Sequence, residues 1–119
     1  MLAAAREYCF PNTFNVTCSG RDEAIVMTSA RYGRMTRGLC LTSDVHVGCW
    51  ADVLYHVDRK CSGRRHCLVM IPDSVLHALQ PCPKDMLAYL DAEFVCQKGT
   101  IGFIILLVLM YVLRIVIFV

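Results

Sequence analysis

The stretch SARYGRMTRGLC, residues 29–40, joins a predicted strand to a cysteine-bounded loop. The residues around its start, 24–31, favour a β-strand with Ile25 and Val26 facing inward. The tripeptide Tyr32-Gly33-Arg34 then interrupts the strand pattern, and Gly33 permits either a turn or a close approach of another backbone segment. Cys40, which ends the stretch, is the third of eight cysteines. These features predict β-structure in a cysteine-rich domain.

The cysteines all lie before residue 98 of the 119-residue chain. An even number at this density in a short domain is typical of a disulfide framework that forms in an oxidising compartment. The sequence has no CxxC pair, which zinc sites commonly use, and we therefore expect no metal. Eight cysteines allow roughly a hundred different pairings, so spacing alone leaves the connectivity open.

The rest of the domain is predicted to contain further strands and one helix. Residues 13–18 and 86–96 alternate between apolar and polar side chains, and residues 67–71 form a short apolar run that ends before Pro72. Trp50, Val53, Leu54 and Val57 recur at helical spacing, which predicts an amphipathic helix over residues 50–60. The expected fold class is α/β (α+β), as a small disulfide-rich antiparallel β domain with one main helix.

Residues 101–119 read IGFIILLVLMYVLRIVIFV and are almost entirely apolar. A helix of this length rises by roughly 28 Å, which is close to the thickness of a bilayer core. We therefore expect a single-pass transmembrane helix here, preceded by a tail over residues 1–5, a domain over 6–97 and a linker over 98–100. Arg114 lies within the apolar run, where it either extends to the headgroups or pairs with an acidic residue of a membrane-helix partner.

Charge excludes one class of ligand. The chain has 12 basic and 10 acidic residues, so it lacks the basic surface of a nucleic-acid-binding protein. One basic cluster stands out in the sequence, and it consists of Arg59, Lys60, Arg64, Arg65 and His66. This cluster is either a solvated loop or a surface that attracts an acidic glycan or partner.

The compartment is inferred from the cysteines. The first nine residues contain no apolar stretch of the kind found in a secretory leader, whereas disulfides require export. We expect a leader encoded upstream and a domain that faces the outside of the plasma membrane. The alternatives are insertion directed by the C-terminal helix and a cytosolic domain with reduced thiols. Asn15-Val16-Thr17 is an N-glycosylation sequon that is used if the domain is exported and Asn15 points outward.

Four segments together carry a family resemblance. They are residues 29–40, the loop CSGRRHC at 61–67, Gln80-Pro81-Cys82, and MLAYLDAEFVC at 86–96. In their order and cysteine spacing they resemble the SUEL-type lectin domain, also called the galactose- or rhamnose-binding lectin domain, over about residues 6–97. The resemblance implies antiparallel strands, one main helix and four disulfides. The implied pairs are Cys9 with Cys40, Cys18 with Cys96, Cys49 with Cys82, and Cys61 with Cys67.

The resemblance also implies a ligand-binding site, from which this sequence departs. The implied residues are Tyr32, Gly33, Arg34, Gln80 and Tyr89. Members that bind rhamnose or galactose use an acidic residue, an aspartate and a lysine where this chain has Phe10, Gln80 and Ala88. Tyr32, Gly33 and Arg34 keep the family pattern, and they either contact a ligand or serve the fold, as a core residue, a turn and a structural ion pair.

These observations favour a binding role. We expect a membrane-anchored, cell-surface recognition domain that binds a glycoprotein or protein ligand, because the usual sugar-binding charges are largely absent. The alternatives are a lectin that binds rhamnose or galactose and an accessory membrane subunit that assembles through its helix. We expect neither a cofactor nor catalysis, because the four histidines are scattered and show no nucleophile–base pattern.

Overall fold

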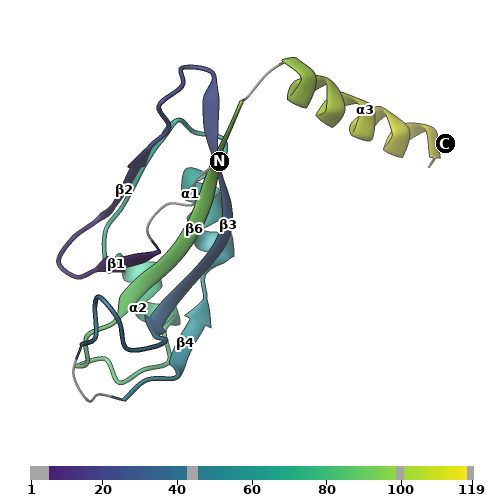
Figure 1. The fold of residues 1–119 in the computed structure, drawn as a ribbon. Helices are drawn as coiled ribbons and strands as arrows, with labels where there is room; N and C mark the ends of the chain where they lie inside the picture. The colour runs from purple at the N-terminus through teal and green to yellow at the C-terminus, as the bar shows by residue number, and fades with distance from the viewer. Residues whose placement is uncertain (1–5, 43–45, 99–100, 118–119) are drawn as a thin grey trace.

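A computed structural model describes residues 6–42, 46–98 and 101–117. Its strands form two antiparallel sheets, one with the order β1-β6-β3-β4 and one that pairs β2 with β5 (Figure 1). The strands are β1 (Glu7–Cys9), β2 (Phe14–Thr17), β3 (Glu23–Arg34), β4 (Cys49–Asp52), β5 (His66–Val69) and β6 (Tyr89–Lys98). The helices are α1 (Leu54–Cys61), α2 (Ser74–Leu79) and α3 (Ile101–Ile117). The predicted small antiparallel β domain is confirmed.

The long central strand β3 changes the side chains that it buries partway along. Ile25 and Met27 are buried, and after a register shift between Met27 and Ser29 the buried positions become Ala30 and Tyr32. A bulge of this kind adds one residue and moves the alternation by one position. Val26, which was expected to face inward, is only half-buried. The bulge therefore brings Tyr32 to the core face near the end of the strand.

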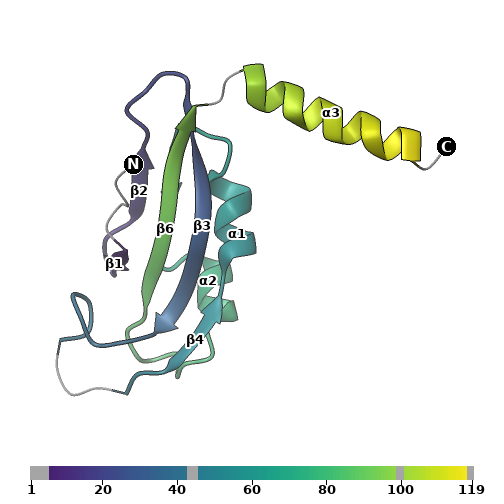
Figure 2. The same ribbon diagram turned by 45° about the vertical axis from the view of Figure 1, so that its right-hand side comes forward.

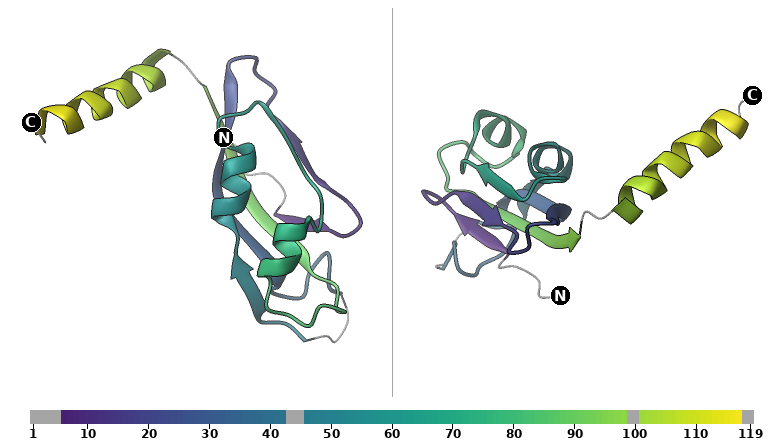
Figure 3. Two further views of the ribbon diagram at one scale, coloured as in Figure 1. Left: turned by 180° about the vertical axis from the view of Figure 1, so that it is seen from behind. Right: turned by 90° about the horizontal axis from the view of Figure 1, so that it is seen from above.

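Helices α1 and α2 lie on the same side of the four-stranded sheet (Figures 2 and 3). Val57 and Cys61 of α1 and Leu76 of α2 are fully buried in the main core. On the β1–β2 side, Phe14 packs edge-on against Tyr8 and Phe94, with ring centroids 4.7 and 6.0 Å apart. A second, smaller hydrophobic core, separate from the main one, contains Met35, Leu41 and Tyr89.

The prediction of a helix over residues 50–60 is wrong for its first residues, 50–53. Cys49–Asp52 is strand β4, in which Trp50 is 42% exposed and pairs with Gly33 of β3. The helix begins only at Leu54, whose N–H donates to Asp52 Oδ1 at 2.9 Å. The helical spacing of Trp50 was therefore coincidental. Its exposed ring does not face the core but lies against the Arg31 guanidinium, whose central carbon is 5.2 Å from the ring centroid.

Two further elements differ from the prediction. Strand β1 was not predicted, and its three residues pair with β6. The expected single main helix is joined by α2, which begins after Asp73, whose Oδ1 accepts from Leu76 N at 2.8 Å. A helix of six residues is too short to show a clear apolar period, so only its N-cap residue marks it in the sequence. The last strand also begins at Tyr89 rather than residue 86.

Four disulfides connect the elements. They join Cys9 to Cys40, Cys18 to Cys96, Cys49 to Cys82, and Cys61 to Cys67. These are the pairs that the family resemblance implied. The Cys18–Cys96 bridge, between residues 78 apart, ties the segment after β2 to β6.

The apolar C-terminal segment forms α3, and Figure 1 shows it apart from the two sheets. Within residues 6–42, 46–98 and 101–117, no helix combines the length and the apolar character that a membrane crossing needs. The predicted transmembrane helix over 101–119 is thus not supported. The predicted tail over 1–5, part of the linker over 98–100 and the last two positions of that helix lie outside the described residues.

Candidate functional site

A cavity of about 190 Å³ opens beside α2, at the end of β3 that carries Tyr32. This is smaller than the roughly 300–1,000 Å³ of sites for drug-sized molecules, so it suits one small ring. The ends of four segments meet here, because β3, the β1–β2 turn, α2 and the loop before β6 converge. The lining residues are Phe10, Tyr32, Pro72, His77, Gln80, Lys84, Asp85, Met86, Leu87 and Ala88.

Tyr32 is, together with Gln80, one of two polar residues of the cavity lining that are almost completely buried. Its side chain lines the cavity although the residue is only 3% exposed. Burial, followed by the nearby charge of Asp73, raises the pKa of Tyr32 to about 12, so the phenol stays neutral at physiological pH. Its hydroxyl forms no hydrogen bond with another residue in the described part of the chain. The hydroxyl of this cavity-lining residue is therefore free to donate to and accept from a ligand.

Lys84 brings a positive charge to the cavity and orders its wall. Its Nζ donates to the carbonyl of His77 at 2.6 Å and to the carbonyl of Gln80 at 2.7 Å. These bonds satisfy the C-terminal end of α2 and use two of the three ammonium hydrogens. The third hydrogen is left for a ligand acceptor. Gln80 is itself buried, and its Oε1 accepts from Cys82 N at 2.8 Å.

Phe10, His77 and Asp85 complete the rim. Phe10 is 53% exposed and follows the crosslinked Cys9, which fixes the position of its backbone. Its ring offers an apolar face to a ligand, whereas the exposed Asp85 carboxylate offers oxygen acceptors. The cavity thus presents an aromatic ring, a phenol, an ammonium and a carboxylate within one small volume.

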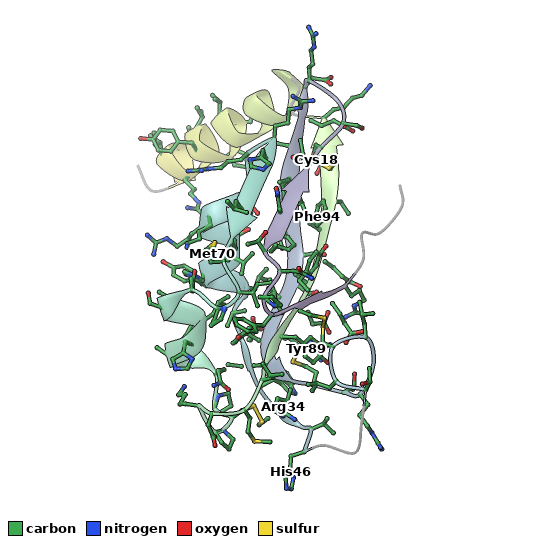
Figure 4. The ribbon with its side chains drawn as sticks, turned by 90° about the vertical axis from the view of Figure 1, so that its left-hand side faces the viewer. Cys18, Arg34, His46, Met70, Tyr89 and Phe94 are labelled. Carbon is green, nitrogen blue, oxygen red and sulfur yellow. A yellow bond between two sulfur atoms is a disulfide. The ribbon has the colours of Figure 1, made fainter. Side chains whose placement is uncertain are left out.

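Gly33 and Arg34 serve the fold around this cavity. Gly33 has a positive φ of 149°, and a Cβ there would lie 2.5 Å from the Cys49 carbonyl oxygen, so the close approach that the sequence permitted is present. Arg34 is 3% exposed and donates from Nε to the carbonyl of His46 at 2.8 Å and from Nη1 to the carbonyl of Leu87 (Figure 4). Because Leu87 lines the cavity, Arg34 holds part of its wall.

Tyr89 lies outside the cavity. It is 1% exposed within the smaller core, and its hydroxyl donates to Thr36 O and accepts from Thr36 N, both at 3.0 Å. Its position in the interior can be followed in Figure 4. Of the five residues that the sequence singled out for ligand binding, the cavity therefore brings together Tyr32 and Gln80 only.

The three positions that depart from the family pattern all line this cavity. They are Phe10, Gln80 and Ala88, which come from three separate parts of the chain. Sequence reasoning found the usual sugar-binding charges largely absent there and missed Lys84 and Asp85. Their signal was faint, since it consisted of two adjacent charged residues directly after Pro83 in a loop.

Other predicted sites lie elsewhere. Asn15 is exposed on β2, and its Oδ1 lies 2.8 Å from Nε2 of His66, so the sequon faces outward while its use stays a prediction. Arg114 is exposed on α3. The described residues contain no group of three or more histidine, cysteine, aspartate or glutamate side chains that could hold a metal ion.

Comparison with known proteins identifies the domain. A family model described as the D-galactoside/L-rhamnose binding SUEL lectin domain matches residues 16–96. No curated protein matches the sequence.

Proposed function

The chain belongs to the D-galactoside/L-rhamnose binding SUEL lectin domain family, and we propose that it binds a carbohydrate in the cavity around Tyr32. The observation that carries this proposal is Tyr32, a largely buried residue that lines the cavity and whose neutral hydroxyl has no partner in the described part of the chain. A sugar hydroxyl supplies both the donor and the acceptor that such a phenol requires.

The cavity supports recognition of one terminal sugar unit. Phe10 would pack against the apolar face of the ring, while Lys84 and Asp85 would bind ring hydroxyls through charge-assisted hydrogen bonds. Each such bond is worth about 1.5–3 kcal/mol, so two charged groups offset much of what the changes at positions 10, 80 and 88 remove. Because Lys84 and Asp85 come from the loop and not from the family positions, we propose that hydroxyl preference differs from the usual members.

The binding test uses the disulfide-bonded full chain on a glycan array, followed by calorimetric titration with galactose, rhamnose and the best array ligand. Tyr32→Phe removes only the hydroxyl and should weaken binding about five- to tenfold, equivalent to roughly 1–1.4 kcal/mol. Tyr8→Phe is the matched control, because Tyr8 is half-buried and lies outside the cavity lining. Binding by Tyr8→Phe should equal that of the natural chain.

Two outcomes contradict the proposal. A folded chain that binds nothing on the array has no lectin activity at this cavity. Equal binding by Tyr32→Phe and the natural chain places the sugar elsewhere. Thermal unfolding measured alongside separates either result from a loss of folding.

We also propose that the natural ligand is a cell-surface glycoprotein and that the domain works outside the plasma membrane. Four disulfides support this, since they persist in oxidising compartments. Alkylation of native material before reduction, followed by mass spectrometry, should find no free thiol. Alkylation of all eight cysteines would remove the extracellular proposal.

For α3 we propose attachment to a membrane. The described side chains from Val108 to Val116 are all exposed and, apart from Arg114, hydrophobic, and a largely apolar surface of this kind typically contacts lipid or protein. The full chain should float with neutral phospholipid vesicles on a density gradient. If it assembles with a membrane-helix partner instead, Arg114→Leu should abolish co-purification of that partner, whereas an unchanged yield excludes this role for Arg114.

A further inference from the structure

We infer that the end of α1 carries a second binding site, which takes an anionic, sulfated glycan. The site is a groove of about 430 Å³ between the last turn of α1 and the start of β5. Its lining residues are Arg59, Lys60, Arg64, His66, Cys67 and Leu68. The groove shares no lining residue with the Tyr32 cavity, so either site can bind without the other.

Two guanidinium groups of the groove are not neutralised by a carboxylate within the described structure. Arg59 lies over the ring of Tyr55, with its central guanidinium carbon 5.4 Å from the ring centroid. Arg64 forms no side-chain hydrogen bond or ion pair with any residue that the structure describes. Both side chains are exposed and therefore keep their charge available to a ligand.

The nearby acidic residues leave the groove positive. Asp73 Oδ2 is shared by Lys60 Nζ at 2.8 Å and His56 Nε2 at 2.7 Å, which offsets the charge of Lys60. Asp58 accepts from Ser62 Oγ at 2.5 Å and does not line the groove. The charges of Arg59 and Arg64 therefore remain uncompensated on the groove.

The groove is held open by covalent and hydrogen-bonded contacts. The Cys61–Cys67 disulfide joins the last residue of α1 to β5. Between these cysteines, Arg65 Nε donates to the carbonyls of Cys18 and Gly20, each at 3.1 Å. Arg64 and Arg59 are therefore fixed to one rigid frame, and binding orders little backbone.

Sulfate esters match this arrangement better than neutral sugars or peptides do. A planar guanidinium binds the oxygens of a sulfate through paired, charge-assisted hydrogen bonds. Most of the groove surface is polar, with Leu68 the apolar side chain at its edge, so it offers little to anchor an apolar peptide side chain. The groove is lined by two arginines, one on α1 and one in the following loop, and this pair suits an oligosaccharide with more than one sulfate.

The test titrates the full disulfide-bonded chain with a heparin-derived hexasaccharide, with its desulfated form as the ligand control. The expected result is binding of the sulfated form only, and binding should weaken steeply between about 0.1 and 1 M salt because exposed charges are screened. Arg59→Gln with Arg64→Gln should weaken binding at least about tenfold, as expected for the loss of two exposed charge contacts. Arg37→Gln removes one charge from the loop after β3 and should bind like the natural chain.

Several results would overturn the inference. They are no binding of the sulfated hexasaccharide, equal binding of the desulfated form, and equal binding by the double variant. Tighter binding of a polyglutamate peptide, or of anionic phospholipid vesicles, in a manner that depends on Arg59 and Arg64 would assign the groove to a different partner. Excess free galactose should not compete, which separates this site from the Tyr32 cavity.

Discussion

At the scale of single residues, the Tyr32-Gly33-Arg34 motif contributes one residue to the cavity lining and two to the structure around the cavity. Tyr32 is largely buried and lines the cavity, and Arg34 binds two backbone carbonyls, one of which belongs to the cavity wall. Gly33 lets β4 approach β3 so closely that Trp50 Cα lies 2.6 Å from the place of a Cβ. The motif is therefore needed for the shape of the site even where it does not touch a ligand.

Gly33→Ala should be strongly destabilising. The new methyl group meets backbone atoms, which cannot move aside as a flexible side chain does, and the residue also sits at a positive φ. We expect a loss of about 3 kcal/mol or more in the free energy of unfolding, measured by urea denaturation with disulfides intact. Gly48→Ala is the matched control, because φ there is 104° but no atom lies within 4 Å of the added Cβ. It should lose only about 1 kcal/mol, and equal losses would contradict the steric explanation.

At the scale of elements, α2 and α1 are joined through one carboxylate. Asp73 caps α2 and also binds His56 and Lys60 of α1. Burial alone would raise the pKa of Asp73, but the hydrogen bonds from Leu76, Lys60 and His56 together lower it to about 2. Since α2 forms one wall of the Tyr32 cavity, this carboxylate also positions the site.

Asp73 should make stability depend on acid pH. A carboxylate whose folded pKa is below its ordinary value stabilises the fold above about pH 4 and loses that contribution as pH falls toward about 2. The contribution is about 2 kcal/mol at neutral pH. Asp73→Asn keeps an oxygen for the cap but loses the charge, so its deficit in unfolding free energy should be largest at pH 7 and vanish near pH 2. Asp73→Ala should lose about 1 kcal/mol more at every pH. A pH-independent deficit in Asp73→Asn would contradict this account.

The elements also show where sequence patterns succeed and fail. The alternation along residues 86–96 located β6 because a strand with a buried face repeats every two residues. The prediction failed at Trp50, because the sequence does not distinguish an exposed aromatic residue that packs on an arginine from one in the core. Strand β1 has only three residues, too few to show an alternation of apolar and polar side chains, and it is defined by its pairing with β6.

At the scale of the whole molecule, the Tyr32 cavity brings together distant parts of the chain, whereas the basic groove comes from one local stretch, residues 59–68. Phe10, Tyr32 and Lys84 are far apart in sequence and meet because β1 and β3 flank β6. The family resemblance located the positions of the departed sugar-binding residues but gave no reason to look at Lys84 or Asp85. Only the structure located these two residues, because it places their loop beside Phe10, Gln80 and Ala88 in the cavity lining.

The disulfides should stabilise the molecule unequally. Cys18–Cys96 closes a loop between residues 78 apart, whereas Cys61–Cys67 joins residues 6 apart. In the chain-entropy view, the longer loop restricts the unfolded chain more, by roughly 4.5 against 2.3 kcal/mol. Replacing Cys18 and Cys96 together by serine should therefore lower the unfolding free energy by about twice as much as replacing Cys61 and Cys67. The readout is urea unfolding followed by the fluorescence of Trp50.

The same variants should differ in the binding of the heparin hexasaccharide, titrated in parallel. In chains that are still folded, loss of Cys61–Cys67 should weaken binding of the hexasaccharide more than loss of Cys18–Cys96 does, because only the former bridge frames the groove. The reverse order of affinities would show that the groove does not depend on its crosslink.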